Sequence, residues 1–170
     1  LYRMKIQYNG TSNTIIEGPT DITYELAADD LAQSPSLSLD GTKVIFSCKK
    51  SNSSYWQIYE VKADGSGGLT PLTMSPGSKL QPFYLPYYPD SLGGAEARDG
   101  KAGFGFVSSL AGFLDEYETG PSYSIFVCDY SGGHQRQIEF NPSNDFHPWL
   151  HSSGMLIFTR WEHNEHQGHN

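Results

Sequence analysis

The densest group of residues that could bind a metal lies at the end of the sequence, in "TRWEHNEHQGHN". His163, His166 and His169 follow one another at a spacing of three, with glutamates beside them. Neutral imidazoles with a carboxylate suit zinc or another borderline transition metal, and histidine also binds haem iron. On a helix His163 and His166 would share one face, whereas on a strand they would point to opposite faces. The interpretation that we favour is a solvated polar loop after a strand, with a metal or haem contact and a contact with a partner subunit as the alternatives.

Two further groups are candidates for a ligand or partner surface. Arg160 and Glu162 flank Trp161, so on a strand both charged side chains lie on the face opposite to the Trp. They would either form an ion pair between neighbouring structural units or line an opening and contact a ligand. Tyr87 and Tyr88 stand in "PFYLPYYPD", where the prolines exclude a regular central strand. We expect these tyrosines on a loop, packed locally or in contact with a partner.

A third group has residue types that occur in hydrolases. Asp145, His147 and His151 precede Ser152 and Ser153. However, no Gly-x-Ser-x-Gly turn accompanies them, and a catalytic triad is defined by geometry rather than by residue types. We therefore predict no catalytic residue in this chain.

The elements that must position these residues are short strands that recur along the chain. The segment "SPSLSLDGTKVIFSCKK", from Ser34, has a proline, a short apolar stretch, an Asp-Gly pair and a second apolar stretch. This order is typical of a strand, a tight turn and a second strand. The same order recurs in "HPWLHSSGMLIFTR", from His147. A further copy begins with "QPFYLPYYPD" and resumes with "AGFGFVSS" after a Gly-rich charged insertion, which we interpret as an exposed loop.

A second hairpin pattern follows each of the complete copies. It appears in "WQIYEVKADGSGGLTPLT" and "YSIFVCDYSGGHQRQIEF", and the first residues, "LYRMKIQYNGTSNTIIEG", repeat it. In each segment three side chains alternate along one face of a strand before a Gly-containing turn. These trios are Tyr59, Val61 and Ala63; Phe126, Cys128 and Tyr130; and Met4, Ile6 and Tyr8.

The order of these hairpins predicts an all-β fold of the β-propeller type. Residues 1–18 form a second hairpin, 34–75 a full unit, 81–140 a full unit with long loops, 146–162 a first hairpin and 163–170 a loop. Units of four antiparallel strands are typical of propeller blades, with a β-sandwich as the alternative. Because a propeller needs about four to eight blades, we expect these roughly three blades to be part of a larger ring.

Composition narrows the classes of function. A net charge of -8 over 170 residues argues against a nucleic-acid-binding protein, because such proteins normally carry a basic patch. No apolar run approaches the about 18 residues of a membrane span. Cys48 and Cys128 form no CxxCH motif, so this segment attaches no c-type haem. The two cysteines either form a disulfide or point separately into the core, and we favour the core.

The repeat resembles that of the TolB-type WD-like β-propellers. The residues that carry the resemblance are "SPSLSLDGTKVIFS" and "IYEVKADGSGGLTPLT". The last third, "SYSIFVCDYSGGHQRQIEFNPSNDFHPWLHSSGMLIFTRWE", resembles the propeller of the hydrazine synthase alpha-subunit family. His163 stands where that family usually has a tyrosine, and its CxxCH motifs do not occur in this segment.

These resemblances lead to two expected functions. The first is a non-catalytic scaffold or protein-interaction platform in an extracytoplasmic, multi-subunit assembly. Its partner would be another protein or the remaining blades, and its location periplasmic or secreted. The alternative is the propeller portion of a haem-dependent redox enzyme subunit, with the haem supplied by other sequence or by a partner. We expect no cofactor in this segment beyond the metal or haem contact of the terminal histidines.

Overall fold

The regular elements of the described residues are all strands in antiparallel sheets, which confirms the all-β class. The structure is a computed structural model, and it describes residues 1–8, 10–86 and 103–161. Every regular element in these ranges is a β-strand. Within the same ranges, no helix has the length and apolarity that crossing a membrane requires.

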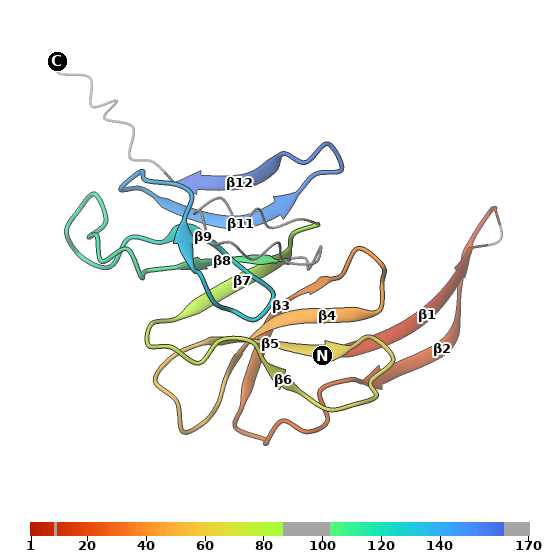
Figure 1. The fold of residues 1–170 in the computed structure, drawn as a ribbon. Coiled ribbons are helices and arrows are strands. Elements are labelled where there is room, and N and C mark those ends of the chain that lie inside the picture. Colours follow the sequence, from red (N-terminus) through yellow and green to blue (C-terminus); the bar gives the residue numbers. More distant parts are fainter. Residues whose placement is uncertain (9, 87–102, 162–170) are drawn as a thin grey trace, which may run out of the picture.

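Two four-stranded sheets lie between two hairpins (Figure 1). The first sheet has the order β3 (Leu31–Leu37), β4 (Lys43–Lys49), β5 (Gln57–Lys62) and β6 (Thr70–Pro71). The second has β7 (Lys79–Tyr84), β8 (Phe104–Ser108), β9 (Ser124–Cys128) and β10 (Arg136–Gln137). The first hairpin joins β1 (Tyr2–Tyr8) to β2 (Asn13–Asp21), and the last joins β11 (Asn144–Leu150) to β12 (Leu156–Trp161).

The Asp-Gly pair between β3 and β4 forms the expected tight turn. Asp40 Oδ1 accepts hydrogen bonds from the Ser38 hydroxyl (2.7 Å) and from the backbone N–H of Thr42 (3.0 Å). These donors lower the pKa of Asp40 to about 2. Gly41 has a φ of 71°, a left-handed conformation that side chains disfavour. The turn is therefore specified by adjacent residues.

The first strands of the three units share one irregularity. Ser34, Gln81 and His147 each precede a proline and have φ values of 55°, 51° and 52°. A register shift marks a β-bulge at each position. The backbone N–H of Gln81 donates to the Ser47 hydroxyl (3.0 Å), and that of His147 donates to Gln81 Oε1 (2.7 Å). The bulges at Gln81 and His147 thus connect the second sheet to the first, and the last hairpin to the second sheet.

Apolar side chains fill three layers between and beside the sheets. The first layer, on the side of the first sheet that faces Ile22, contains Val44, Phe46, Cys48 and Val61. The second lies between the two sheets and contains Ile45, Ile58, Tyr84, Phe104, Phe106, Phe126 and Cys128. The third joins the second sheet to the last hairpin through Phe83, Val107, Ile125, Leu150, Leu156 and Phe158. Strands β4 and β8 are therefore buried on both faces.

The two cysteines lie in different apolar layers. Cys48 belongs to the first and Cys128 to the second, and both are free buried thiols. Burial raises the pKa of each thiol. The disulfide alternative is therefore wrong, and the inward interpretation is confirmed.

At the bulge of the first strand, each sheet pairs one large residue with one small residue, but the large residue lies on different strands in the two sheets. Two residues after the left-handed position, β7 has Phe83 opposite Gly105 of β8, whereas β3 has Ser36 opposite Ile45 of β4. A Cβ added to Gly105 would lie 2.2 Å from the Phe83 ring. The large residue is thus on the first strand of the second sheet, and on the second strand of the first sheet.

This packing predicts the effect of Gly105→Ala. Because the new methyl group overlaps the Phe83 ring, the substitution should lower the free energy of unfolding by about 1–3 kcal/mol. In a Phe83→Ala background the additional loss should disappear, since the ring is gone. Urea denaturation of the four proteins of this double-mutant cycle measures both effects. Additive losses would contradict the assigned contact.

Candidate functional site

Arg160 connects the last hairpin to the second sheet. It lies opposite Asp145 in the β11–β12 register, and its guanidinium contacts both oxygens of that fully buried carboxylate, Nε–Oδ1 at 2.9 Å and Nη2–Oδ2 at 3.0 Å. Nη2 also lies 2.7 Å from Oε1 of Glu139, which follows β10. The two-point geometry fixes the guanidinium plane. Arg160 thus forms one ion pair within its hairpin, with Asp145, and one with Glu139 beyond the second sheet, whereas the proposed ligand surface of Arg160 and Glu162 stays a prediction.

Glu139 lies in an environment that disfavours its charged form. Its side chain is 12% exposed, and burial together with the neighbouring Asp145 raises its pKa. Arg160 opposes this shift because it stabilises the carboxylate. One guanidinium therefore contacts two carboxyl groups, and the pKa of Glu139 is the one that the proximity of the two acids raises.

The residues considered for a hydrolase do not form a triad. Asp145 is engaged by Arg160, whereas His151 Nδ1 lies 2.8 Å from the Ser153 hydroxyl in its own turn. The backbone of His147 is held by Gln81. The structure therefore places these side chains in separate contacts rather than in one hydrogen-bonded series.

Trp161 lies on the opposite face of β12 from Arg160, as strand alternation predicts. Its ring centroid is 5.8 Å from that of Tyr117, in the loop between β8 and β9. Phe113 and Leu114 belong to the same loop, and Leu114 pairs with Pro121 to close it. We name the exposed side chains of Phe113, Leu114, Tyr117 and Trp161 the Trp161 surface; they are 49%, 55%, 49% and 44% exposed.

The loop that carries Tyr117 has its own internal support. The Asp115 carboxylate accepts hydrogen bonds from the backbone N–H groups of Tyr117 (3.1 Å) and Thr119 (2.9 Å). These bonds lower the pKa of Asp115. The aromatic side chain is therefore presented by an ordered turn.

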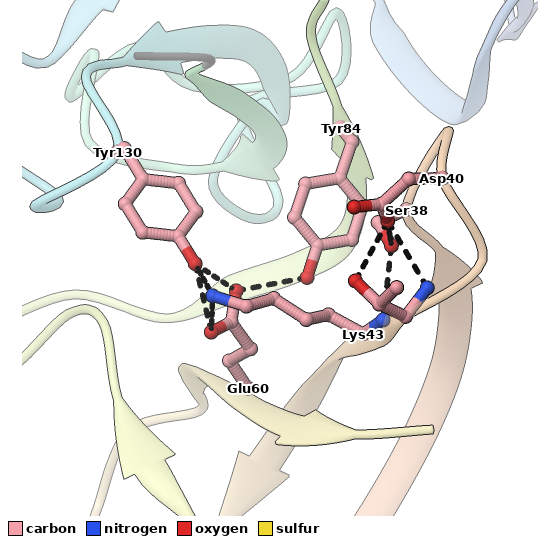
Figure 2. A network of polar contacts seen from close by, with 7 residues as sticks. Ser38, Asp40, Lys43, Glu60, Tyr84 and Tyr130 are labelled. Atoms are coloured by element: carbon pink, nitrogen blue, oxygen red, sulfur yellow. Dashed lines mark hydrogen bonds and ion pairs between the residues drawn. The ribbon is translucent and has the colours of Figure 1, made fainter. Parts of the chain in front are cut away.

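A second polar cluster lies between the two complete sheets (Figure 2). The buried Glu60 of β5 accepts hydrogen bonds from Lys43 Nζ (2.9 Å) and from the Tyr84 hydroxyl (2.9 Å), and the Tyr130 hydroxyl lies 2.9 and 2.8 Å from its two oxygens. Lys43 Nζ also contacts the Tyr130 hydroxyl and lies 4.8 Å from the centre of its ring. We name these four residues the Glu60 cluster.

The Glu60 cluster changes the proton affinity of its members. Burial, and then the Glu60 carboxylate, raises the pKa of Tyr84. Burial also raises the pKa of Tyr130, and the contacts with Tyr130 and Glu60 raise that of Lys43. A cavity of about 330 Å³ beside the cluster is lined by Asp40, Leu39 and Leu85 among others. The Glu60 side chain thus contacts one lysine and two tyrosines, and its bonds to Tyr84 and Tyr130 join the first sheet to the second.

Several candidate residues from the sequence lie outside the described residues. They are Tyr87, Tyr88, Glu162, His163, His166 and His169. In the part of the chain that the structure describes, no group of three or more His, Cys, Asp or Glu side chains is arranged to hold a metal ion. The interpretation of the terminal histidines as a metal or haem contact stays a prediction.

Comparison with solved structures identifies the fold. The chain is similar to part of "Kuenenia stuttgartiensis Hydrazine Synthase", with a TM-score of 0.64 and 22% identity over 88% of this chain and 23% of that chain. It is also similar to "The structure of putative TolB from Agrobacterium tumefaciens", with a TM-score of 0.60 and 21% identity over 88% of this chain and 45% of that chain. No protein-family model and no curated protein matches.

The two similar structures agree with the resemblances that the repeat showed. Both the TolB-like and the hydrazine-synthase-like relationship are thus found in the fold. The chain spans less than half of either similar chain. The described residues therefore form part of a β-propeller, as the repeats predicted, and identity at this level establishes the fold alone.

The Glu60 cluster predicts how Tyr84→Phe changes stability. Loss of a hydrogen bond to a charged group should lower the free energy of unfolding by about 1.5–3 kcal/mol near pH 7. Because the pKa of Tyr84 is raised in the folded chain, its stabilising contribution is present below the unfolded value of about 10 and is lost as the pH rises above it. The penalty should therefore shrink in alkaline solution. Urea denaturation at pH 7 and near pH 11 tests this, with the exposed Tyr24→Phe as control; a penalty that grows with pH would contradict it.

Glu139 predicts a second pH dependence of stability, in the acidic range. The raised pKa of this carboxyl means that its contribution to stability is present at acid pH and is lost as the pH rises through the folded-state pKa. The stability of the natural chain relative to Glu139→Gln should therefore be greater at pH 4.5 than at pH 7. Denaturant titration at both pH values measures this difference, and Glu118→Gln, at an exposed position, controls for loss of one charge. An advantage that increases toward pH 7 would refute the assignment.

Proposed function

We propose that this chain is a non-catalytic β-propeller scaffold that binds a protein partner in an extracytoplasmic assembly. The observation that carries the proposal is the contact between two exposed aromatic side chains, Trp161 of β12 and Tyr117 of the β8–β9 loop, a loop that also exposes Phe113 and Leu114. Tyr, Trp and Phe are enriched at the centres of protein interfaces. An ordered loop also loses less conformational entropy on binding than a mobile one.

The buried charges support a structural role for the sheets. Asp145 is paired with Arg160, Glu60 with Lys43, and Asp30, whose side chain is 4% exposed, with Lys50 at 2.9 Å. A catalytic acid or base must reach a substrate. These three carboxylates instead contact cations of the same chain, so their charges are used to hold strands and sheets together.

The extracytoplasmic location is a proposal that rests on resemblance. TolB-type propellers are mostly periplasmic or secreted, and the repeat and the fold both resemble that group. The partner is proposed as a protein because the Trp161 surface is apolar and the net charge of -8 disfavours nucleic acid.

A second candidate function is the propeller portion of a haem-dependent redox subunit. The similarity to part of a chain titled hydrazine synthase favours it. Haem would be supplied by other sequence or by a partner, and His163, His166 and His169 would provide its contact. Since these histidines lie outside the described residues, no chemical step is assigned to them.

The platform proposal predicts that one surface controls partner binding. The chain should retain a defined protein from an extracytoplasmic extract of its source cells. Tyr117→Ala and Trp161→Ala should each weaken retention at least tenfold, because truncating a central aromatic side chain commonly costs more than about 1.4 kcal/mol. Phe140, 73% exposed, gives the matched control Phe140→Ala, which should bind as the natural chain does.

Two outcomes would contradict this proposal. Retention that is insensitive to both variants would remove the Trp161 surface as the binding site. A Soret absorption band in the purified chain that His163→Ala, His166→Ala or His169→Ala abolishes would favour the redox alternative.

A further inference from the structure

Bulges and turns provide equivalent positions in successive sheets. Each bulge has a left-handed residue, Gln81 in β7 and His147 in β11, and three residues later stand Tyr84 and Leu150. Tyr84 belongs to the Glu60 cluster, whereas Leu150 packs in the third apolar layer. The same position is therefore polar at the interface between the two complete sheets and apolar at the next interface.

The position of Glu60 shows the same difference. Glu60 and Val127 each stand five residues before a glycine with positive φ, Gly65 or Gly132. Val127 shares a strand face with Ile125 of the third apolar layer, so it points toward the next unit as Glu60 does. Both side chains are buried, and apolar residues can replace a buried ion pair without loss of stability. Stacking of the sheets therefore does not require a charge at this position.

The Glu60 cluster borders the cavity of about 330 Å³ that lies between the two complete sheets. Leu39, Leu85 and Pro86 form apolar walls, and Asp40 and Lys43 contribute charged groups to the lining. Sites for small molecules are commonly cavities of about 300–1,000 Å³ with mostly apolar walls and a few convergent polar groups. This cavity has the same composition.

Lys43 brings one unused hydrogen-bond donor to the cavity. A lysine ammonium group has three N–H donors. Nζ lies 2.9 Å from Glu60 Oε1 and contacts the Tyr130 hydroxyl, and no other described residue accepts a hydrogen bond from it. The side chain is 37% exposed, so the third donor is available to a bound molecule.

Asp40 brings one unused acceptor of opposite charge. Its Oδ1 accepts hydrogen bonds from the Ser38 hydroxyl and from the N–H and hydroxyl of Thr42, whereas Oδ2 accepts none from another described residue. The pKa of Asp40 is about 2, so the carboxylate is charged at neutral pH. Asp40 also lies near the cluster, because its charge adds to burial and to Glu60 in raising the pKa of Tyr84.

We propose that this cavity binds a small zwitterion with an apolar side chain, such as a free aliphatic α-amino acid. The ligand carboxylate accepts a hydrogen bond from Lys43, its ammonium group donates to Asp40, and its side chain contacts Leu39 and Leu85. A ligand with only a carboxylate would add a negative charge beside Glu60 and Asp40, and one with only an ammonium group would add a positive charge beside Lys43. The proposal rests neither on the Trp161 surface nor on a haem contact.

Three probes with the same apolar body test this charge requirement. They are L-leucine, 4-methylpentanoate, which lacks the ammonium group, and 3-methylbutylamine, which lacks the carboxylate. Isothermal titration calorimetry of the full chain at pH 7 should give a Kd for L-leucine below about 1 mM. Each of the other probes should bind at least about tenfold more weakly, because it loses one hydrogen bond between charged groups.

Asp40→Asn provides the matched variant. The asparagine keeps a side-chain oxygen for the bonds from Ser38 and Thr42, but its amide group replaces the free Oδ2 with a donor. L-leucine should therefore bind at least about tenfold more weakly. Asp64→Asn is the control, since Asp64 Oδ1 accepts a hydrogen bond from the backbone N–H of Ser66 (2.8 Å) in another exposed turn and does not line the cavity. Far-ultraviolet circular dichroism of both variants checks that the fold is retained.

Each of four results would overturn the proposal. The first is binding of 4-methylpentanoate or 3-methylbutylamine as tight as that of L-leucine. The second is equal affinity of the natural chain and Asp40→Asn for L-leucine. The third is binding of D-glucose without binding of L-leucine, which would assign the cavity to a neutral polyol. The fourth is the absence of binding by every probe at tens of millimolar.

Discussion

The structure depends on one constraint: the central strands carry apolar side chains on both faces. In β4, Val44 and Phe46 point into the first apolar layer, while Ile45 points into the second. In β8, Phe106 and Val107 divide in the same way between the second and third layers. A sheet of this composition must be covered on both sides, because burying apolar area is the main source of stability. Successive sheets therefore stack face to face.

Apolar stacking alone leaves the relative position of two sheets poorly defined, since the hydrophobic effect has no direction. Directed polar contacts supply this definition, and they differ between interfaces. Glu60 contacts tyrosines of the second sheet, whereas Arg160 of the last hairpin contacts Glu139 beyond β10. The bulges add a further contact, with the backbone N–H of His147 on Gln81. All the interfaces between sheets bury apolar side chains, but each has different polar contacts.

The sequence predicted the elements that local chemistry determines. The Asp40-Gly41 turn is fixed by bonds among Ser38, Asp40 and Thr42, all within a few residues. Strand faces followed from alternation, and this also indicated that Cys48 and Cys128 point inward. The arrangement of the strands into propeller blades followed because the same local pattern recurs.

Contacts between distant segments were not predictable in the same way. Tyr130 lies 70 residues from Glu60 in the sequence, and neither residue type indicates the other as its partner. The pairing of Asp145 with Arg160 could be predicted in principle, because aligning the hairpins on their prolines and turns brings the two residues opposite each other. The contact between Tyr117 and Trp161 could not be predicted, since it depends on the conformation of the loop that Asp115 supports.

The difference between strand faces and loops explains how the proposed partner surface can vary without loss of the fold. Side chains on the strand faces have little freedom, as the overlap between Phe83 and any Cβ at residue 105 shows. The β8–β9 loop instead closes on itself through the Leu114–Pro121 bridge and the bonds to Asp115. Its exposed aromatic side chain can therefore change with little cost to the stacked sheets. The strand faces, in contrast, carry the alternating apolar side chains that a neighbouring sheet buries, so their residues cannot change as freely.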